Sequence, residues 1–285
     1  MSKIEIKNLT KAYGNNVALE NLTLNIEEKK IYGLLGRNGA GKTTLLNLMT
    51  NKLFPTNGEI TIDSETVFEN ENTLSKIYYM SEFNLYPDTM KVKNLFKWTK
   101  EFYSDFDTEY AINLSDKFGL NRNKKFRELS TGYNSILKII LTLASNAEIL
   151  LFDEPILGLD ANHRDMFYKE LINHYSDTPK TIIISTHLIE EVADIIEEVI
   201  IINNGKLMLT DHTETILSSG YTISGKSEDM DLFIQDKNVI GMDAIGRFKS
   251  AYILGEIPST EVLNKHNLEI TKLDLQKLFI QLTNS

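Results

Sequence analysis

Apolar and polar residues follow two different spacings along this chain. Near-alternate apolar positions over residues 4–9 and 22–26 are typical of half-buried strands. The runs over 31–35, 149–152 and 181–185 are instead almost entirely apolar, as in strands that are covered on both faces. Together these segments predict an α/β fold with a mixed sheet at its core.

The spacing changes to that of helices in the middle of the chain. From residue 92 to residue 125 apolar residues recur at helical intervals, which predicts a mostly helical insert. After the stretch 129–133, which reads LSTGY, apolar residues again fall on one face of a predicted helix that Ser130 is suited to cap. We place this helical subdomain at about residues 84–145.

The last third of the chain alternates short predicted strands and helices. Helices are expected over 162–175 and 188–196, and Asn203-Asn204-Gly205 between two apolar runs indicates a hairpin. Beyond residue 218 we predict strands at 221–224, 239–242 and 251–254, and helices at 229–234, 259–266 and 274–282. We therefore divide the chain into a first domain of residues 1–217 and a small α+β accessory domain of residues 218–285.

A glycine-rich loop lies between the predicted strand at 31–35 and a predicted helix. It fills every fixed position of G-x-x-x-x-G-K-[ST], so a glycine-rich turn without function is the weaker interpretation. Backbone N–H groups of such a loop point at one anion, Lys42 can reach the terminal phosphates, and the Thr43 hydroxyl suits Mg²⁺. The loop thus predicts ATP binding through Asn38, Gly39, Ala40, Gly41, Lys42, Thr43 and Thr44.

Two acidic residues follow the apolar strand at 149–152. Ligands of open α/β sheets bind at the carboxyl ends of the strands, which is where Asp153 and Glu154 stand. Asp153 can hold Mg²⁺ directly or through water, and Glu154 can polarise the attacking water. The alternative, a solvated turn, is disfavoured by the fully apolar strand before them.

Two ring-bearing residues have two interpretations each. His187 follows the strand at 181–185, where it either hydrogen-bonds a γ-phosphate or has a purely structural role, and we favour the phosphate contact. Tyr13 precedes a glycine turn upstream of the phosphate loop, where it either stacks on a nucleotide base or plugs a sheet edge.

Composition limits the partners. The net charge of −10 argues against a nucleic-acid surface, and the lack of cysteine excludes disulfides and thiolate metal sites. The N-terminus lacks the apolar core of a signal peptide, so we expect a cytoplasmic chain. No apolar run approaches the roughly 20 residues that cross a bilayer, so any membrane role should depend on a partner.

The order of these motifs resembles that of the ATP-binding cassette (ABC) ATPases of ABC transporters over about residues 1–215. The series comprises the phosphate loop, LSTGY, ILLFDEP, GLD and STH. The resemblance implies a P-loop NTPase fold and the cofactors ATP and Mg²⁺. It also implies that Gly36 to Thr44 form the Walker A loop and Ile149 to Asp153 the Walker B strand. The remaining roles that it implies are Glu154 as catalytic glutamate, Asp160 in the D-loop, His187 as switch histidine, and Tyr13 as the adenine-stacking residue.

The resemblance also implies partners. Ser130 and Gly132 lie in the signature that contacts ATP held by the opposite subunit, so the chain is expected to form a head-to-tail dimer. That dimer would be a homodimer or a pair with a sister ATPase, bound to an integral-membrane permease at the cytoplasmic face of the membrane. Lys42, Glu154 and His187 are accordingly expected to line one pocket.

Two residues depart from the family pattern. Glu82 stands where the family usually has glutamine; it can reach Mg²⁺ or the attacking water, but its charge beside phosphates raises the cost of binding. Thr131 replaces a glycine of the signature, which puts tight closure on the partner's ATP in question. Both departures resemble those of bacterial exporters of peptides and antibiotics, and in particular the ATPase of a staphylococcal exporter of cytolytic peptides, the phenol-soluble modulins.

An aromatic-rich segment follows Glu82. Phe83, Leu85, Tyr86 and Pro87, with Phe96 and Trp98 further on, provide apolar surface where the family binds a short cytoplasmic helix of its membrane subunit. For Phe96 and Trp98, filling the core of the helical insert is an equal alternative.

Three functions are therefore weighed. The first is an ATPase that drives export of a peptide or drug-like molecule through a separate membrane subunit. The second is a soluble cassette ATPase unconnected with transport, and the third is an ATP-gated regulatory protein that hydrolyses ATP poorly. We favour the first, because the chain has a single phosphate loop and no basic arm, whereas cassettes that act on ribosomes normally carry two in one chain.

Overall fold

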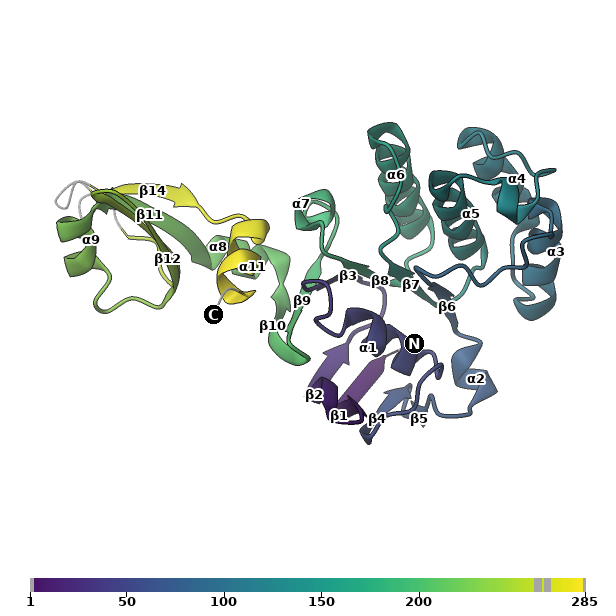
Figure 1. The fold of residues 1–285 in the computed structure, drawn as a ribbon, viewed down its shortest axis with the longest axis horizontal. Helices are drawn as coiled ribbons and strands as arrows, with labels where there is room; N and C mark the ends of the chain where they lie inside the picture. Colours follow the sequence, from purple (N-terminus) through teal and green to yellow (C-terminus); the bar gives the residue numbers. More distant parts are fainter. Residues whose placement is uncertain (1–2, 259–262, 264–267, 284–285) are drawn as a thin grey trace.

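A computed structural model describes residues 3–258, 263 and 268–283 (Figure 1). The elements in chain order are β1 (Ile4–Tyr13), β2 (Asn16–Ile26), β3 (Ile31–Leu35), α1 (Lys42–Met49), β4 (Asn57–Ile62), β5 (Glu65–Thr66), α2 (Glu71–Leu74), β6 (Ile77–Met80), α3 (Val92–Phe102), α4 (Thr108–Lys117), a 3-10 turn η1 (Phe126–Glu128), α5 (Thr131–Ala144), β7 (Ile149–Asp153), α6 (Ala161–Asp177), β8 (Thr181–Thr186), α7 (Ile189–Val192), β9 (Glu198–Asn203), β10 (Lys206–His212), α8 (Thr213–Ser219), β11 (Gly220–Lys226), α9 (Ser227–Phe233), β12 (Val239–Ile245), β13 (Phe248–Leu254), β14 (Glu269–Lys272) and α11 (Leu275–Thr283).

A six-stranded sheet in the order β10-β9-β3-β8-β7-β6 forms the centre of the molecule. Its strands run parallel except β10, which pairs antiparallel with β9 through the predicted Asn203-Asn204-Gly205 turn. Every residue of β3, β7 and β8 is buried, as the apolar runs in these strands predicted. The carboxyl ends of these three strands therefore meet at one edge of the sheet.

A second sheet, in the order β2-β1-β4-β5, is antiparallel and packs with α1 against the central sheet. Ile4, Ile6 and Leu9 of β1 are fully buried in this core, which confirms the half-buried strand predicted from their spacing. The architecture is an α/β fold with a mixed sheet core and a helical subdomain, as predicted.

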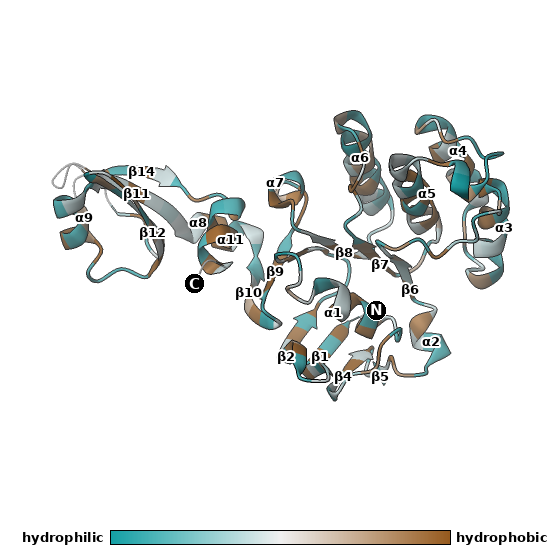
Figure 2. Ribbon diagram, in the orientation of Figure 1, coloured by the Kyte–Doolittle hydropathy of each residue, from teal (hydrophilic) through white to brown (hydrophobic). Residues whose placement is uncertain are grey.

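Helices α3, α4 and α5 form a group beyond β6, and α5 contacts both of the others (Figure 1). The Ser130 side chain accepts a hydrogen bond from the backbone N–H of Tyr133 at 3.3 Å, which confirms the predicted N-cap of α5. Figure 2 shows hydrophobic and hydrophilic residues side by side on α4 and α6, as expected of helices with one face on a core.

A third sheet, in the order β12-β13-β11-β14, follows α8 and has α9 packed on it. Tyr221, Ile223 and Met230 lie in its own hydrophobic core. The predicted strands and the helix at 229–234 are present, but β14 was missed because its four residues are mostly exposed. The helix predicted over 259–266 falls on residues that, apart from position 263, lie outside the described part of the chain.

Helix α11 leaves the third sheet and packs on α7 near the edge of the central sheet (Figure 1). Leu275, Leu278 and Phe279 belong to the main core, which also contains Ile189 and Val192 of α7. The C-terminal segment is therefore joined to the first part of the chain by buried apolar contacts.

The helix predicted over 188–196 is wrong in length. Only Ile189–Val192 is helical, and the chain then turns through a hydrogen bond from the N–H of Ile195 to the carbonyl of Val192. The physical reason is that β9 starts at Glu198, paired with Tyr32 of β3, so the chain must leave the helix within a few residues.

Within residues 3–258, 263 and 268–283, no helix combines the length and the apolar character that crossing a membrane requires.

Candidate functional site

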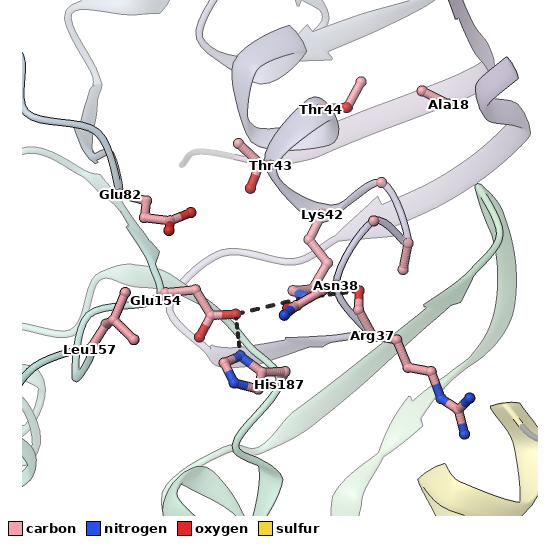
Figure 3. Close-up of a pocket in the computed structure, with 13 residues that line it drawn as sticks. Ala18, Arg37, Asn38, Lys42, Thr43, Thr44, Glu82, Glu154, Leu157 and His187 are labelled. Atoms are coloured by element: carbon pink, nitrogen blue, oxygen red, sulfur yellow. Dashed lines mark hydrogen bonds and ion pairs between the residues drawn. The ribbon is translucent and has the colours of Figure 1, made fainter. Parts of the chain in front are cut away.

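A cavity of about 460 Å³ opens at the carboxyl ends of β3, β7 and β8 (Figure 3). The residues that line it come from β2, from the phosphate loop and the start of α1, and from the turns after β6, β7 and β8: Ala18, Arg37, Asn38, Gly39, Ala40, Gly41, Lys42, Thr43, Thr44, Glu82, Glu154, Leu157 and His187. Phosphate-loop residues predicted from the sequence are thus brought together with Glu82, Glu154 and His187.

The loop between β3 and α1 depends on glycine for its shape. Gly41, immediately before α1, has φ of +110°, and a Cβ there would lie 2.7 Å from Leu19 and 2.8 Å from the carbonyl of Ala18. Only glycine fits this conformation and this space. The first N–H groups of α1 have no partner inside the helix, so the loop presents donors and the positive end of the helix dipole to an anion.

Lys42 holds a positive charge between this loop and Glu154. Its side chain is buried, and its Nζ donates to the carbonyls of Gly36 at 2.6 Å and of Arg37 at 3.3 Å. The Nζ lies 3.7 Å from Glu154 Oε1. Burial lowers the pKa of Lys42, and the carboxylates of Glu154 and Asp153 oppose that shift.

Glu154 has an unusual backbone for a non-glycine residue, with φ of +49°. Its N–H donates to the carbonyl of Ser185 at 2.9 Å. Its two carboxylate oxygens are held separately, Oε2 by the Thr186 hydroxyl at 3.1 Å and Oε1 by His187 Nδ1 at 2.9 Å. Figure 3 shows dashed lines from Oε1 of this carboxylate to both Lys42 and His187. The left-handed turn aims the side chain into the cavity, and β8 fixes it there.

Asp153 does not line the cavity. Its side chain is fully buried, with Oδ1 accepting from Ser185 Oγ at 2.9 Å and Oδ2 from the Tyr79 hydroxyl at 3.1 Å. Each hydroxyl uses one acceptor position on its oxygen, and a carboxylate has further positions. Contact between Asp153 and a metal ion, directly or through water, stays a prediction.

The residues at the cavity fit a magnesium ion. Figure 3 shows the Thr43 hydroxyl and the Glu82 carboxylate directed toward the same space. Mg²⁺ takes oxygen ligands and is commonly held by one or two side chains together with substrate phosphates. Among the described residues no three acidic, histidine or cysteine side chains form a metal-binding group.

Tyr13 is outside this cavity. Its side chain is 47% exposed, and the Lys11 ammonium lies 5.0 Å from the centre of its ring. The sheet-edge plug is therefore wrong, because a plug would be buried. Stacking on a nucleotide base stays a prediction.

Ser130 and Gly132 line a different cavity at the N-terminus of α5, together with residues 158–160 and His163. A Cβ at Gly132 would lie 2.7 Å from the carbonyl of Gly158, so the helix start and the loop after β7 are in close contact. The Thr131 methyl group lies against Gly158, so this added side chain faces its own loop. Asp160 caps α6 by accepting from the N–H of His163 at 2.9 Å.

A third, apolar cavity of about 420 Å³ lies on the helical subdomain. Tyr86, Pro87 and Trp98 line it, whereas Phe96 is buried in the core, as the alternative interpretation of Phe96 had it. Phe83 and Leu85 are more than half exposed beside it.

Several residues of the site were not identified from the sequence. Ala18 and Leu157 line the cavity, and Tyr79, Ser185 and Thr186 hold the two acidic side chains. Ser185 and Thr186 stand in the STH motif, so their position before His187 was an available signal. Nothing in the spacing pointed to Ala18, which is contributed by a different sheet.

A protein-family profile described as ABC transporter matches residues 19–157. The chain is 30% identical over 251 residues to the ABC transporter ATP-binding protein YtrB of Bacillus subtilis, covering 88% of this chain and 86% of YtrB. It is 34% identical over 215 residues to the bacitracin transport ATP-binding protein BcrA of Enterococcus faecalis, covering 72% of this chain and 68% of BcrA. The ribose import ATP-binding protein RbsA of Lactococcus lactis is 30% identical over 226 residues, but this is only 45% of RbsA.

Solved structures of ABC transporter cassettes are also similar to this chain. The dimeric structure of MJ0796, a bacterial ABC transporter cassette, has a TM-score of 0.66 and 26% identity, covering 74% of this chain and 98% of that cassette. A post-hydrolysis dimer of MJ0796 bound to ADP and Pi has a TM-score of 0.65 and 27% identity.

Proposed function

The chain belongs to the ABC transporter family of ATP-binding proteins, and on that premise we propose that it powers export of a peptide or drug-like molecule through a separate membrane permease. As a member it is an ATPase coupled to transport. The observation that carries the proposal is the convergence of the phosphate loop, Lys42, Glu154 and His187 on one cavity.

In this mechanism the loop N–H groups and the start of α1 bind the phosphates, and Lys42 moves its ammonium from the loop carbonyls to the terminal phosphates. Glu154 orients a water molecule in line with the γ-phosphate and accepts its proton. His187 is held through Nδ1 by Glu154, which leaves Nε2 for a phosphate oxygen. Closure of the site excludes competing water, and product release reopens it.

Thr43 and Glu82 would hold Mg²⁺ together with the phosphates, and Asp153 would hold it directly or through water. Bound there, the cation neutralises charge that develops on the phosphate oxygens. Its charge also compensates that of Glu82, which otherwise repels the phosphates.

The proposed assembly is a head-to-tail dimer of two cassettes. Each Ser130–Gly132 helix start would complete the phosphate site of the other subunit with a hydroxyl and N–H groups. The separate cavity at this helix start and the dimeric cassettes of MJ0796 support the proposal. Homodimer and pairing with a sister ATPase remain the two forms of it.

The proposed permease contact is the apolar cavity beside Tyr86. Aromatic anchors in a groove suit an amphipathic helix of the membrane subunit, which would hold the chain at the cytoplasmic face of the membrane. Tyr86→Ala is expected to leave ATP affinity unchanged while abolishing coupled transport. Loss of ATP affinity in this variant would contradict the proposed contact.

The proposed cargo rests on two grounds. Glu82 and Thr131 resemble residues of bacterial peptide and antibiotic exporters, including the staphylococcal exporter of phenol-soluble modulins, and one relative bears the name of bacitracin transport. We also propose that residues 1–217 form the motor and residues 218–285 an accessory domain.

Two measurements test this function. Purified chain should hydrolyse Mg–ATP, and a strain lacking it should retain peptides inside the cell, with secretion restored by wild type and not by Glu154→Gln. ATP binding without turnover would favour the regulatory alternative. A defect in sugar uptake with normal secretion would overturn export.

A further inference from the structure

A buried lysine on α5 contacts the loop that carries Glu82. The Lys138 side chain is 6% exposed, and its Nζ donates to three successive carbonyls, those of Ser81 at 3.0 Å, Glu82 at 2.7 Å and Phe83 at 3.3 Å. An ammonium has three N–H donors, so each donor has its own acceptor.

Burying an ammonium group costs free energy unless each of its N–H donors has an acceptor. Here the backbone carbonyls of residues 81–83 satisfy all three donors. Of the loop side chains, the Glu82 carboxylate lines the phosphate cavity and Phe83 is 67% exposed. Lys138 thus fixes the backbone from which Glu82 extends.

The charge surroundings agree with this role. Burial lowers the pKa of Lys138, and the carboxylates of Glu82 and Asp153 oppose the shift. The Lys138 ammonium therefore interacts electrostatically with both carboxylates, those of Glu82 and Asp153. The positive charge of Lys138 also partly offsets the negative charge of Glu82. A glutamine at position 82, as is usual in the family, would carry no such charge.

Lys138 also connects two parts of the site. Helix α5 begins at the Ser130 cap, and Lys138 lies two turns further along the same helix. A displacement of α5 is therefore transmitted to the Glu82 loop through three hydrogen bonds. Among the described residues, no other helix is hydrogen-bonded to residues 81–83, whereas Asp88 and Met90 further along the loop accept from η1.

We propose that Lys138 is a positioning residue that holds the 81–83 loop against α5 and so keeps the Glu82 carboxylate at the phosphate cavity. The inference rests on the proposed function, since it assigns Glu82 a part in ATP hydrolysis. It concerns a residue that the motif series does not include.

The test is a double-mutant cycle on the full-length chain. Lys138→Met keeps the apolar stem and removes the donors, so kcat for Mg–ATP hydrolysis should fall about tenfold or more while KM changes little. Glu82→Ala should lower kcat comparably, and Lys138→Met should add less than about twofold in that background. Lys138→Arg keeps charge and donors and should recover most of the rate.

Hydrogen exchange provides a readout that needs no turnover. Amides of residues 81–85 should exchange faster in Lys138→Met and at the wild-type rate in Lys138→Arg. Lys180→Met is the control, because Lys180 is half-buried and likewise donates to a backbone carbonyl, that of Asn146 at 2.9 Å, and neither residue lines the phosphate cavity. If Lys138→Met does not fold, Lys138→Gln takes its place in the cycle.

The outcomes separate this inference from the function itself. A wild-type chain that neither binds nor hydrolyses ATP would overturn the proposed function. The hydrogen-exchange data would still test whether Lys138 holds residues 81–83. An active wild type with fully additive effects of Lys138→Met and Glu82→Ala, or with unchanged exchange over 81–85, would overturn the role of Lys138.

Discussion

At the scale of single residues, Glu154 combines strain with fixed orientation. A non-glycine residue in the left-handed region costs on the order of 1–3 kcal/mol, and such residues persist only where their surroundings hold them. Thr186, His187 and Ser185 provide that support from the adjacent strand. The conformation is the kind of local strain that accompanies a site of chemistry.

We expect Glu154→Gln to bind ATP with near wild-type affinity but to lower kcat at least about a hundredfold, because the amide cannot accept a proton from water. The closed dimer should accumulate with ATP, which size-exclusion chromatography detects. Glu59→Gln, an exposed glutamate on β4, is the control. Turnover at the wild-type rate in Glu154→Gln would exclude Glu154 as the base.

His174 gives the fold a pH dependence that is separate from the reaction. Its ring stacks on Tyr110 with centroids 5.8 Å apart, and its Nε2 is buried without a hydrogen-bond partner. Burial lowers the pKa of His174 below the ordinary 6.5, with Lys180 adding to the effect. Below pH 6.5 the unfolded chain therefore binds a proton that the folded chain does not.

The free energy of unfolding should accordingly fall as pH drops from 6.5 toward the folded-state pKa, and His174→Phe should remove this part of the fall. Phenylalanine keeps the stacking on Tyr110 and does not titrate. Urea unfolding at pH 7.5, 6.5 and 5.5 measures the difference between the two proteins. Parallel stability curves would show that His174 titrates normally.

At the scale of elements, the start of α5 is confined by close backbone contact. The carbonyl of Gly158 occupies the space where a side chain at position 132 would begin. The Thr131 methyl group already lies on the same glycine. The signature helix and the loop after β7 must therefore move together.

Gly132→Ala should displace the helix start, although alanine is the better helix former by about 1 kcal/mol. ATP affinity of the isolated subunit should stay unchanged, because its own phosphate loop is intact, while kcat falls about tenfold or more. Asn162→Ala in the first turn of α6 is the control. Normal turnover in Gly132→Ala would place the signature outside the reaction.

The elements differ in how far sequence could predict them. The strands β3, β7 and β8 were predicted because burial on both faces leaves an unbroken apolar run. The length of α7 and the existence of β14 depend on pairing with distant strands, which local spacing does not report. The same limit applies to the site: motifs identified Lys42, Glu154 and His187, whereas Lys138 lies in a helix where its spacing is unremarkable.

At the scale of the whole molecule, α11 joins the C-terminal segment to the main core. Leu278 is fully buried, and Leu275 and Phe279 lie in the same core as the residues of α7. Trp98 is the single tryptophan of the sequence and lies on the helical subdomain at the other end of the central sheet. Its fluorescence therefore reports unfolding far from α11.

Leu278→Ala should lower the free energy of unfolding by about 2–5 kcal/mol, and the Trp98 transition should shift with it. Ile280→Ala, on the more exposed side of the same helix, should cost less than about 1 kcal/mol. Chemical denaturation followed by fluorescence compares the two. A Trp98 transition that ignores Leu278→Ala would show two units that unfold independently.

The contact between α11 and α7 also has a consequence during synthesis. During translation, residues 189–196 are synthesised tens of residues before the apolar residues of α11, at 275–279, that pack on them. A nascent chain therefore exposes Ile189 and Val192 for that interval, which makes this segment an expected binding site for chaperones.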